Sequence, residues 1–243
     1  MVVMTTRPTY LELADLLAVE LKTAPAGTKV PSEHDLVAAH GVSRITARAA
    51  LQELELRYLV RRVRGAGTFV RRRIDYVIDK NLPPSFSATV AAAGGAPGSR
   101  LLGVVRRAPD RGSTYEQEIA DGGDIVEIHR VSLVDGVPAN VATMRMSGKQ
   151  LPDIEEHLDD DVSVHALLQE VYGITLRRWR HQVTLDVPDT TVASLLGDEA
   201  PRPCWYAESL NRIEGTTQLG EYASSWAHPQ VIRKVFQIEE ERQ

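Results

Sequence analysis

The sequence predicts an α+β protein with two modules: a winged helix-turn-helix over residues 1–73, then a larger domain with a mostly antiparallel sheet and helices. Three observations support this fold class. Residues 1–73 carry helix caps and helical apolar spacing that lead into a short strand pair. The later sequence alternates strands with short helices, which is typical of α+β domains. The net charge also changes sign between the two parts.

The charge is unevenly distributed. The 243 residues have a formal net charge of −5, but residues 1–73 hold 12 basic and 7 acidic residues and are net positive. The remainder holds 16 basic and 26 acidic residues. Residues 41–73 contain nine arginines, and their only acidic residues are Glu53 and Glu55. Such asymmetry indicates a basic module with a polyanionic partner, joined to a separate acidic module.

The first two helices are predicted from spacing and caps. Apolar residues fall on one face of the first helix: Tyr10, Leu13, Leu17 and Leu21. Pro25 and Gly27 are expected to end it. Ser32 and Asp35 have the spacing of a capping box that starts a second helix, and Gly41 suits the left-handed position after its end.

A third helix begins after Ser43, and its expected buried stripe is Ala47, Leu51, Leu54 and Tyr58. A helix, a tight glycine turn and a capped helix form the helix-turn-helix pattern. Arg44 and Arg48 lie one turn apart near the end that enters the major groove in this motif, where arginine can bind guanine. Ser43 and Thr46 are placed for phosphate or base-edge contacts. Taken alone, these residues are also compatible with a solvated helix surface.

A basic wing is predicted next. Strands at 59–63 and 68–70 flank Arg64, Gly65, Ala66 and Gly67. The two glycines permit positive φ in a tight hairpin, and Arg64 at the tip suits a minor-groove probe. No helix follows the Gly-x-Gly, so it is not a dinucleotide motif. The helix-turn-helix and the wing together favour a DNA-binding module.

Three strings, PSEHDL, HGVSRITARAAL and RGAGTFV, resemble the winged-helix domain of the GntR family of bacterial regulators. The resemblance implies that Ser43, Arg44, Thr46 and Arg48 read DNA. It also implies that the Gly65–Gly67 wing contacts the minor groove or the backbone. His34 stands where many members carry an arginine that contacts phosphate.

Residues 74–86 are interpreted as a linker that ends in Pro-Pro, and residues 87–243 as a second domain. Short joins between neighbouring strands favour an antiparallel sheet with helices on one face. The predicted strands are 101–105, 125–134, 139–146, 175–187, 204–213 and 219–227, and the predicted helices are 163–172 and 189–196.

Residues 85–238 resemble the effector-binding domain of the HutC branch of the GntR family, which shares its fold with chorismate lyase. The strings GITLRR, LN and EY are most like those of the PhnF type, which regulates phosphonate and phosphate-ester uptake. The resemblance implies a chorismate-lyase-like domain that binds an effector and forms a homodimer.

The same resemblance implies an anion site. Its expected residues are Phe86, Ser87, Arg130, Ser132 and Ser163, with His165, Arg178, Glu221 and Tyr222 as further effector-binding candidates. Ser132 and Ala142 replace an arginine and a glutamate of sugar-phosphate-binding members, so a phosphate, phosphonate or simple phosphoester is favoured. Two alternatives stay open: Ser163 as a plain helix cap and Arg130 as a surface residue. Only one of Arg177 and Arg178 can face inward, and Asp159–Asp161 is expected to be a solvated loop.

The remaining features limit the function classes. Cys204 is the single cysteine, so no disulfide framework or cysteine-based metal site is expected. Without a signal peptide, membrane-length apolar run, nucleophile–base pair or metal-ligand spacing, we expect a cytoplasmic protein that is not an enzyme. The expected function is a ligand-responsive regulator, a repressor that binds a palindromic double-stranded DNA operator as a homodimer. The alternatives are a regulator responding to a sugar phosphate, an enzyme of the lyase-like fold, and an architectural DNA-binding protein.

Overall fold

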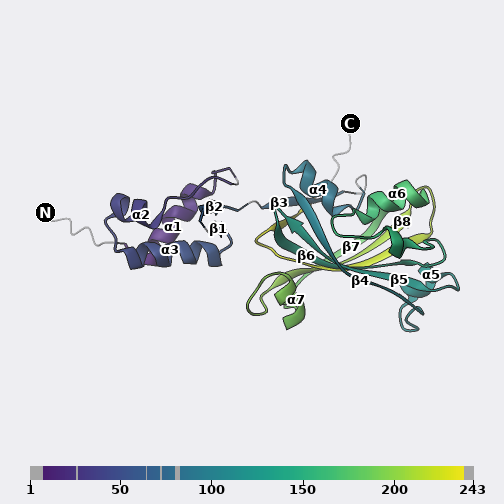
Figure 1. The fold of residues 1–243 in the computed structure, drawn as a ribbon. Coiled ribbons are helices and arrows are strands. Elements are labelled where there is room, and N and C mark those ends of the chain that lie inside the picture. Colours follow the sequence, from purple (N-terminus) through teal and green to yellow (C-terminus); the bar gives the residue numbers. More distant parts are fainter. Residues whose placement is uncertain (1–7, 26, 64, 72, 80–82, 238–243) are drawn as a thin grey trace, which may run out of the picture. The chain divides into compact units, whose positions relative to one another are not determined.

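The computed structural model describes residues 8–25, 27–63, 65–71, 73–79 and 83–237. The chain divides into two compact units, residues 1–73 and 74–243 (Figure 1). Each unit has its own hydrophobic core. Within the described ranges, no helix combines the length and the apolar content needed to span a membrane.

The first unit contains three helices and a hairpin: α1 (Tyr10–Leu21), α2 (Glu33–His40), α3 (Arg44–Leu56), β1 (Val60–Val63) and β2 (Gly67–Val70). The predicted capping box at α2 is present, because the Ser32 and Asp35 side chains each bond the other's backbone amide. Gly41 then ends α2 at φ +64°. The leucine stripes of α1 and α3 meet in one core that also holds Leu36 and Val60.

Two details of this unit differ from the prediction. The segment before α2 pairs with the hairpin, since the Val30 amide bonds the Thr68 carbonyl at 2.8 Å and the Val70 amide bonds the Thr28 carbonyl at 2.8 Å. Tyr58 lies beyond the end of α3 at φ +57° and is only partly buried. The wing is therefore a hairpin backed by a third extended segment.

The second unit is built on a six-stranded antiparallel sheet in the order β4-β5-β6-β9-β8-β7 (Figure 1). This confirms the predicted α+β class. Its elements are β3 (Ile74–Ile78), α4 (Phe86–Ala92), β4 (Pro97–Arg107), α5 (Thr114–Ala120), β5 (Ile125–Val134), β6 (Val137–Ser147), the 3₁₀ helix η1 (Ile154–His157), α6 (Val164–Tyr172), β7 (Leu176–Asp186), α7 (Thr190–Leu195), β8 (Cys204–Ile213), β9 (Leu219–Ala227) and β10 (Ile232–Phe236).

The predicted linker is wrong over its first part. Residues 74–78 form β3, which pairs in parallel with β10 and belongs to the second unit. Ile74, Tyr76 and Ile78 are buried while the residues between them are not. The short apolar alternation was thus a half-buried strand, whose partner lies more than 150 positions later.

Helices cover both faces of the sheet rather than the single face expected. On β5, Val126 and Ile128 pack in a cluster with residues of α6, whereas Ile125 packs with residues of α5 and Val131 with residues of α7. Because successive strand residues face opposite sides, α6 lies on one face and α5 and α7 on the other. The face that carries α6 also carries the cavity described below.

Candidate functional site

The start of α3 is organised by its cap. The Ser43 hydroxyl accepts a hydrogen bond from the Thr46 amide at 3.1 Å, and the two hydroxyl oxygens are 2.8 Å apart. Arg44 follows the cap and is exposed. The predicted DNA-reading side chains therefore share one exposed helix end, with Ser43 and Thr46 partly occupied by the cap itself.

Arg48 has an intramolecular partner that the sequence did not indicate. Its Nε and Nη2 donate to Glu33 Oε1 and Oε2 at 3.0 and 3.1 Å. The Arg48 hydrogen bond holds the pKa of the Glu33 carboxyl below its usual value. Arg48 remains largely exposed, so the pair orients the guanidinium on the surface without burying it.

Ile45 was missed as a candidate. Its side chain is 82% exposed, directly after Arg44 on the same helix end. An exposed β-branched residue at a DNA-facing position can contact the methyl group of thymine. The signal available from sequence was its place outside the buried stripe of α3.

The wing has the predicted glycines at positive φ, +77° for Gly65 and +125° for Gly67. A Cβ on Gly67 would lie 2.9 Å from Lys29 Cε, because the Lys29 side chain packs directly against this glycine. Lys29 is exposed and adds a cation to the wing. His34 is exposed on α2, 3.9 Å from Asp35. Arg64 lies outside the described residues.

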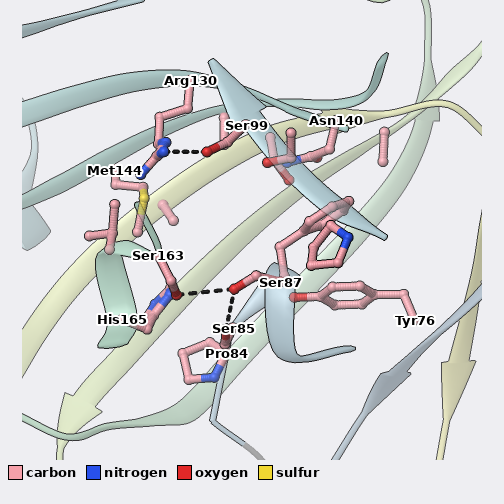
Figure 2. A pocket seen from close by; sticks show the side chains of 18 of the residues that line it. Tyr76, Pro84, Ser85, Ser87, Ser99, Arg130, Asn140, Met144, Ser163 and His165 are labelled. Atoms are coloured by element: carbon pink, nitrogen blue, oxygen red, sulfur yellow. Dashed lines mark hydrogen bonds between the residues drawn. The ribbon is translucent and has the colours of Figure 1, made fainter. Parts of the chain in front are cut away.

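The second unit contains a cavity of about 160 Å³ on the α6 face of the sheet (Figure 2). It brings together seven of the nine predicted effector residues: Phe86, Ser87, Arg130, Ser132, Ser163, His165 and Glu221. These come from α4, β5, the start of α6 and β9. Residues far apart in the sequence thus converge on one enclosure.

A chain of serine hydroxyls lines one side of this cavity (Figure 2). Ser87 Oγ donates to Ser163 Oγ at 3.0 Å, and Ser85 Oγ lies 3.2 Å from Ser87 Oγ. Ser163 stands at the N-cap of α6, yet among the described residues its hydroxyl caps no amide. The plain-cap alternative for Ser163 is therefore excluded, and the first amides of α6 keep no side-chain cap.

Arg130 is buried on β5, not on the surface, with 4% exposure. It donates to Ser99 Oγ and, at 3.4 Å, to the Asp159 carbonyl. Burial lowers its pKa, although it stays far above neutrality for a guanidinium. A charged group that lines a cavity without a carboxylate in hydrogen-bonding contact can bind an anion.

His165 and Glu221 meet at the base of the cavity. Glu221 is fully buried, and its Oε2 lies 3.3 Å from His165 Nε2 and accepts a bond from Asn211. Burial raises the pKa of Glu221, but His165 and Asn211 outweigh it and keep the value lowered. Glu221 is thus a buried carboxylate that already has donors.

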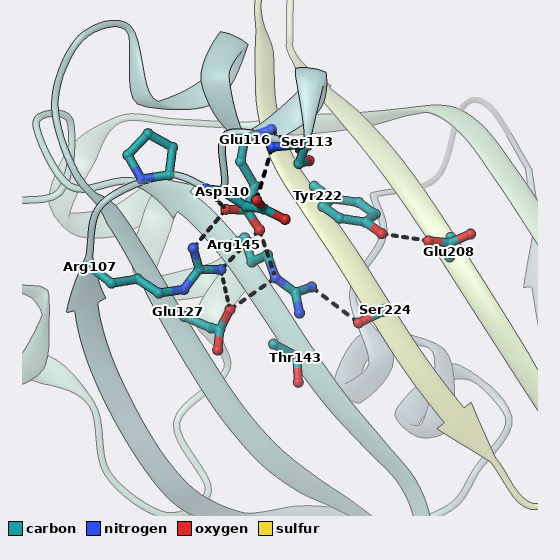
Figure 3. A network of polar contacts seen from close by, with 12 residues as sticks. Arg107, Asp110, Ser113, Glu116, Glu127, Thr143, Arg145, Glu208, Tyr222 and Ser224 are labelled. Carbon is teal, nitrogen blue, oxygen red and sulfur yellow. Dashed lines mark hydrogen bonds and ion pairs between the residues drawn. The ribbon is translucent and has the colours of Figure 1, made fainter.

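Two predicted effector residues do not line the cavity in the described structure. Tyr222 neighbours Glu221 on β9 and so points to the opposite face, where its hydroxyl donates to Glu208 at 2.5 Å and its ring stacks near Arg145 (Figure 3). Its assignment is corrected. Arg178 lies behind Tyr76, with Nη2 3.3 Å from the Tyr76 hydroxyl, while Arg177 pairs with Glu214.

The Asp159–Asp161 loop is exposed, as expected, and it also anchors the edge of the sheet. Asp161 Oδ1 accepts from the Ser99 amide and Asp160 Oδ1 from the Leu101 amide, each at 2.7 Å. These carboxylates fix the β4 edge beside Arg130. The sequence showed only an acidic run, which did not reveal its backbone partners.

Several polar residues of the cavity were not predicted: Ser85, Ser99, Asn140, His181, Asn211 and Lys234. Lys234 and His181 lie on β10 and β7. Burial with nearby positive charge lowers the pKa of Lys234 to about 8 and that of His181 to about 3. No sequence pattern marked either residue.

Comparisons with known proteins agree on both units. The description "Bacterial regulatory proteins, gntR family" matches residues 9–70, and "UTRA domain" matches residues 92–233. The probable transcriptional regulator PhnF of Escherichia coli (strain K12) is 28% identical over 234 residues, 94% of this chain and 95% of that protein. The HTH-type transcriptional repressor PhnF of Mycolicibacterium smegmatis is 27% identical over 188 residues, 77% of this chain and 74% of that protein. The crystal structure of PhnF from Mycobacterium smegmatis superimposes with a TM-score of 0.63 at 22% identity, covering 93% of this chain and 98% of that one.

Proposed function

This chain belongs to the gntR family of bacterial regulatory proteins and carries its UTRA domain, and on that premise we propose that a small phosphorus-containing anion in the cavity controls its DNA binding. The chain is a transcriptional regulator rather than an enzyme, as its relatives are. The proposed effector is a phosphate, phosphonate or simple phosphoester.

The observation that carries the anion proposal is the pairing of Ser163 with Ser87. A serine at a helix N-terminus usually caps its own helix, but the Ser163 hydroxyl bonds Ser87 across the cavity wall at 3.0 Å. The uncapped amides of α6, the serine hydroxyls and the buried Arg130 guanidinium together offer donors of the kind that bind oxyanions.

The effector class follows from what the cavity contains. Ala142 and Ser132 line it where sugar-phosphate-binding members of the branch have a glutamate and an arginine. A hexosamine phosphate would then lose partners for its hydroxyls, and unpaired polar groups in a buried site cost affinity. A sugar phosphate remains the second candidate, because Glu221 and Asn211 still offer acceptors at the base.

On the DNA side, the proposed regulator binds a palindromic operator as a homodimer and acts as a repressor. One α3 helix contacts only a few base pairs, and two copies spaced by one DNA turn supply a longer site. An effector changes operator affinity only through its different affinity for the DNA-competent and DNA-free arrangements. One of the relatives is named as a repressor, which supports repression rather than activation.

A thermal-shift titration of the full chain tests the anion site. Phosphate, methylphosphonate and glycerol phosphate should raise the melting temperature more than sulfate or glucosamine 6-phosphate does. Arg130→Ala and Ser163→Ala should lose this response, while Arg100→Ala, which removes an exposed arginine outside the cavity lining, should keep it. An unchanged response in Arg130→Ala would count against the site. Gel shifts with the same ligands measure release of the operator and so test repression. Sedimentation of the free protein tests dimerisation.

A further inference from the structure

The cavity has a second cationic end, away from Arg130. Lys234 lines it from β10, and its ammonium lies 4.4 Å from the centre of the Tyr76 ring. The Arg178 guanidinium carbon lies 5.8 Å from the same ring centre. Two cations therefore share one aromatic side chain, an attraction that compensates burial only in part.

Neither cation forms an ion pair or a hydrogen bond with a carboxylate within the described residues, and Arg178 interacts with Glu221 only through its charge. Arg178 Nε and Nη1, together with Nε2 of the nearby His181, are buried without hydrogen-bond partners. Lys234 makes no ion pair or hydrogen bond in the described ranges. Buried donors and charges without partners are costly and uncommon. Lys234 and His181 line the cavity and Arg178 does not, so a bound acidic group would contact Lys234 directly and would be attracted by Arg178 only through its charge.

The carboxylates that line the cavity form no hydrogen bond or ion pair with Lys234 in the described ranges. Glu221 Oε2 is engaged by His165 and Asn211, while its Oε1 has no hydrogen-bond partner, and Asp161 accepts from the Ser99 amide. Asp161 also lies at the Arg130 side of the cavity, as its Ser99 contact shows. Lys234 is therefore left facing the cavity with no acid committed to it.

The two cationic ends are well separated. Arg130 is on β5, whereas Arg178 and His181 are on β7, and three strands lie between β5 and β7 in the sheet. The cavity volume of about 160 Å³ corresponds to on the order of ten water-sized positions. A single phosphoryl group at Arg130 would leave the Lys234 end filled by solvent.

We propose that the Tyr76–Lys234 end is a second acid-binding subsite, so that the effector carries a phosphoryl or phosphonyl group at Arg130 and Ser163 and a carboxylate at Lys234. This inference rests on the proposed function, since it presupposes the first anion site. Lys234 contacts the carboxylate directly, and Arg178 behind Tyr76 adds its positive field. The effector class narrows to phosphonocarboxylates and phosphorylated carboxylic acids.

Isothermal titration of the full chain with two ligand series tests this subsite. One series consists of ω-carboxyalkylphosphonates with one to four methylene groups, and the other of alkylphosphonates with the same number of carbons. In the wild type, at least one carboxylate should bind about tenfold or more tightly than its alkyl counterpart, as expected for a charge-assisted bond. Lys234→Met should lose that advantage and keep the alkylphosphonate affinity, which also shows that the variant is folded. Lys149→Met, which removes an exposed lysine of the same unit, should behave like the wild type.

The outcomes separate the two proposals. If alkylphosphonates bind but a carboxylate adds nothing at any chain length, the second subsite is overturned and the first anion site stands. The same holds if Lys234→Met retains the carboxylate advantage. If neither series binds the wild type, the anion site itself fails and the second subsite falls with it.

Discussion

Arg48 of α3 and Glu33 of α2 form a two-pronged ion pair, with Nε–Oε1 and Nη2–Oε2 distances of 3.0 and 3.1 Å. Glu33 is the first residue of α2 and directly follows the Ser32 cap. The pair therefore ties the orientation of a predicted DNA-reading arginine to the start of the preceding helix. Because the arginine is exposed, its main effect is on orientation, since exposed ion pairs add little stability.

Arg48→Ala should weaken operator binding about 5- to 100-fold, as expected for loss of one bidentate base contact, and leave the free energy of unfolding almost unchanged. Gel shifts on operator DNA and urea denaturation measure the two effects. Glu33→Gln is the matched control: it disturbs the orientation of Arg48 but keeps its charge, so its affinity loss should be smaller. Normal operator binding by Arg48→Ala would rule out its role as a reader.

Ile45→Ala should weaken binding to the operator and leave binding to unrelated DNA unchanged. A thymine-methyl contact carries sequence information, whereas non-specific affinity comes from phosphate neutralisation. With 82% exposure, Ile45 contributes little to folding, and thermal melting should be unaltered. Val19→Ala, another exposed apolar residue of the same unit, controls for loss of surface area. Equal losses on both DNA sequences would assign Ile45 to backbone contact only.

The first unit could be predicted closely because its signals are local. The Ser32–Asp35 cap and Gly41 are defined by residues within one helix, and the structure has each of them as expected. The third extended segment at Thr28–Val30 was missed, since it makes only a few backbone bonds and carries no strand-like alternation. Partner choice between distant segments, as for β3 and β10, has no local signal at all.

The errors in the predicted site have separate structural causes. Glu221 and Tyr222 are adjacent on β9, so only one of them could face the cavity. The orientation of Arg178 was open because the β7–β8 register shifts between Arg178 and Arg180, which interrupts simple alternation. Lys234 was missed because its role depends on Tyr76, which lies 158 positions earlier in the paired strand.

Glu116→Gln should destabilise the second unit by about 2–4 kcal/mol, because it breaks a largely buried charge network. Glu116 Oε2 and Oε1 accept from Arg107 at 2.7 and 2.9 Å, and Arg145 Nε lies 3.3 Å away (Figure 3). In the part of the chain that the structure describes, Glu127 alone would then pair with both arginines. Guanidinium chloride denaturation measures the loss. Glu155→Gln, whose pair with Arg106 is more exposed, should cost much less, and equal costs would contradict the network's importance.

Lys234→Met should stabilise the ligand-free protein at pH 7, by about 1–3 kcal/mol given 1.4 kcal/mol per pKa unit. The pKa of Lys234 is lowered to about 8 by burial, then by Arg178, so the folded state holds this proton more weakly than the unfolded state. The cost of the charge is full below pH 8 and disappears as the pH rises towards 10.5. The stability difference between variant and wild type should therefore shrink above pH 8. A destabilised variant at pH 7 would show that Lys234 is satisfied in the free protein.

His181 should make the second unit lose stability on mild acidification. The pKa of His181 is lowered from 6.5 to about 3, first by burial and then by Lys234 and Arg178. Between these two pH values the histidine is protonated in the unfolded chain and neutral in the folded state. Stability is then fully present above pH 6.5 and falls towards pH 3, with a slope of up to about 1.4 kcal/mol per pH unit. Lowered carboxylate pKa values, as at Glu221, act only below about 4.5, so the interval from pH 6.5 to 5 excludes the carboxylates, and the comparison of wild type with His181→Gln separates His181 from the other six histidines that both proteins share. Denaturation at pH 7, 6 and 5 should show a flatter profile for His181→Gln, and parallel profiles would assign the acid sensitivity to other groups.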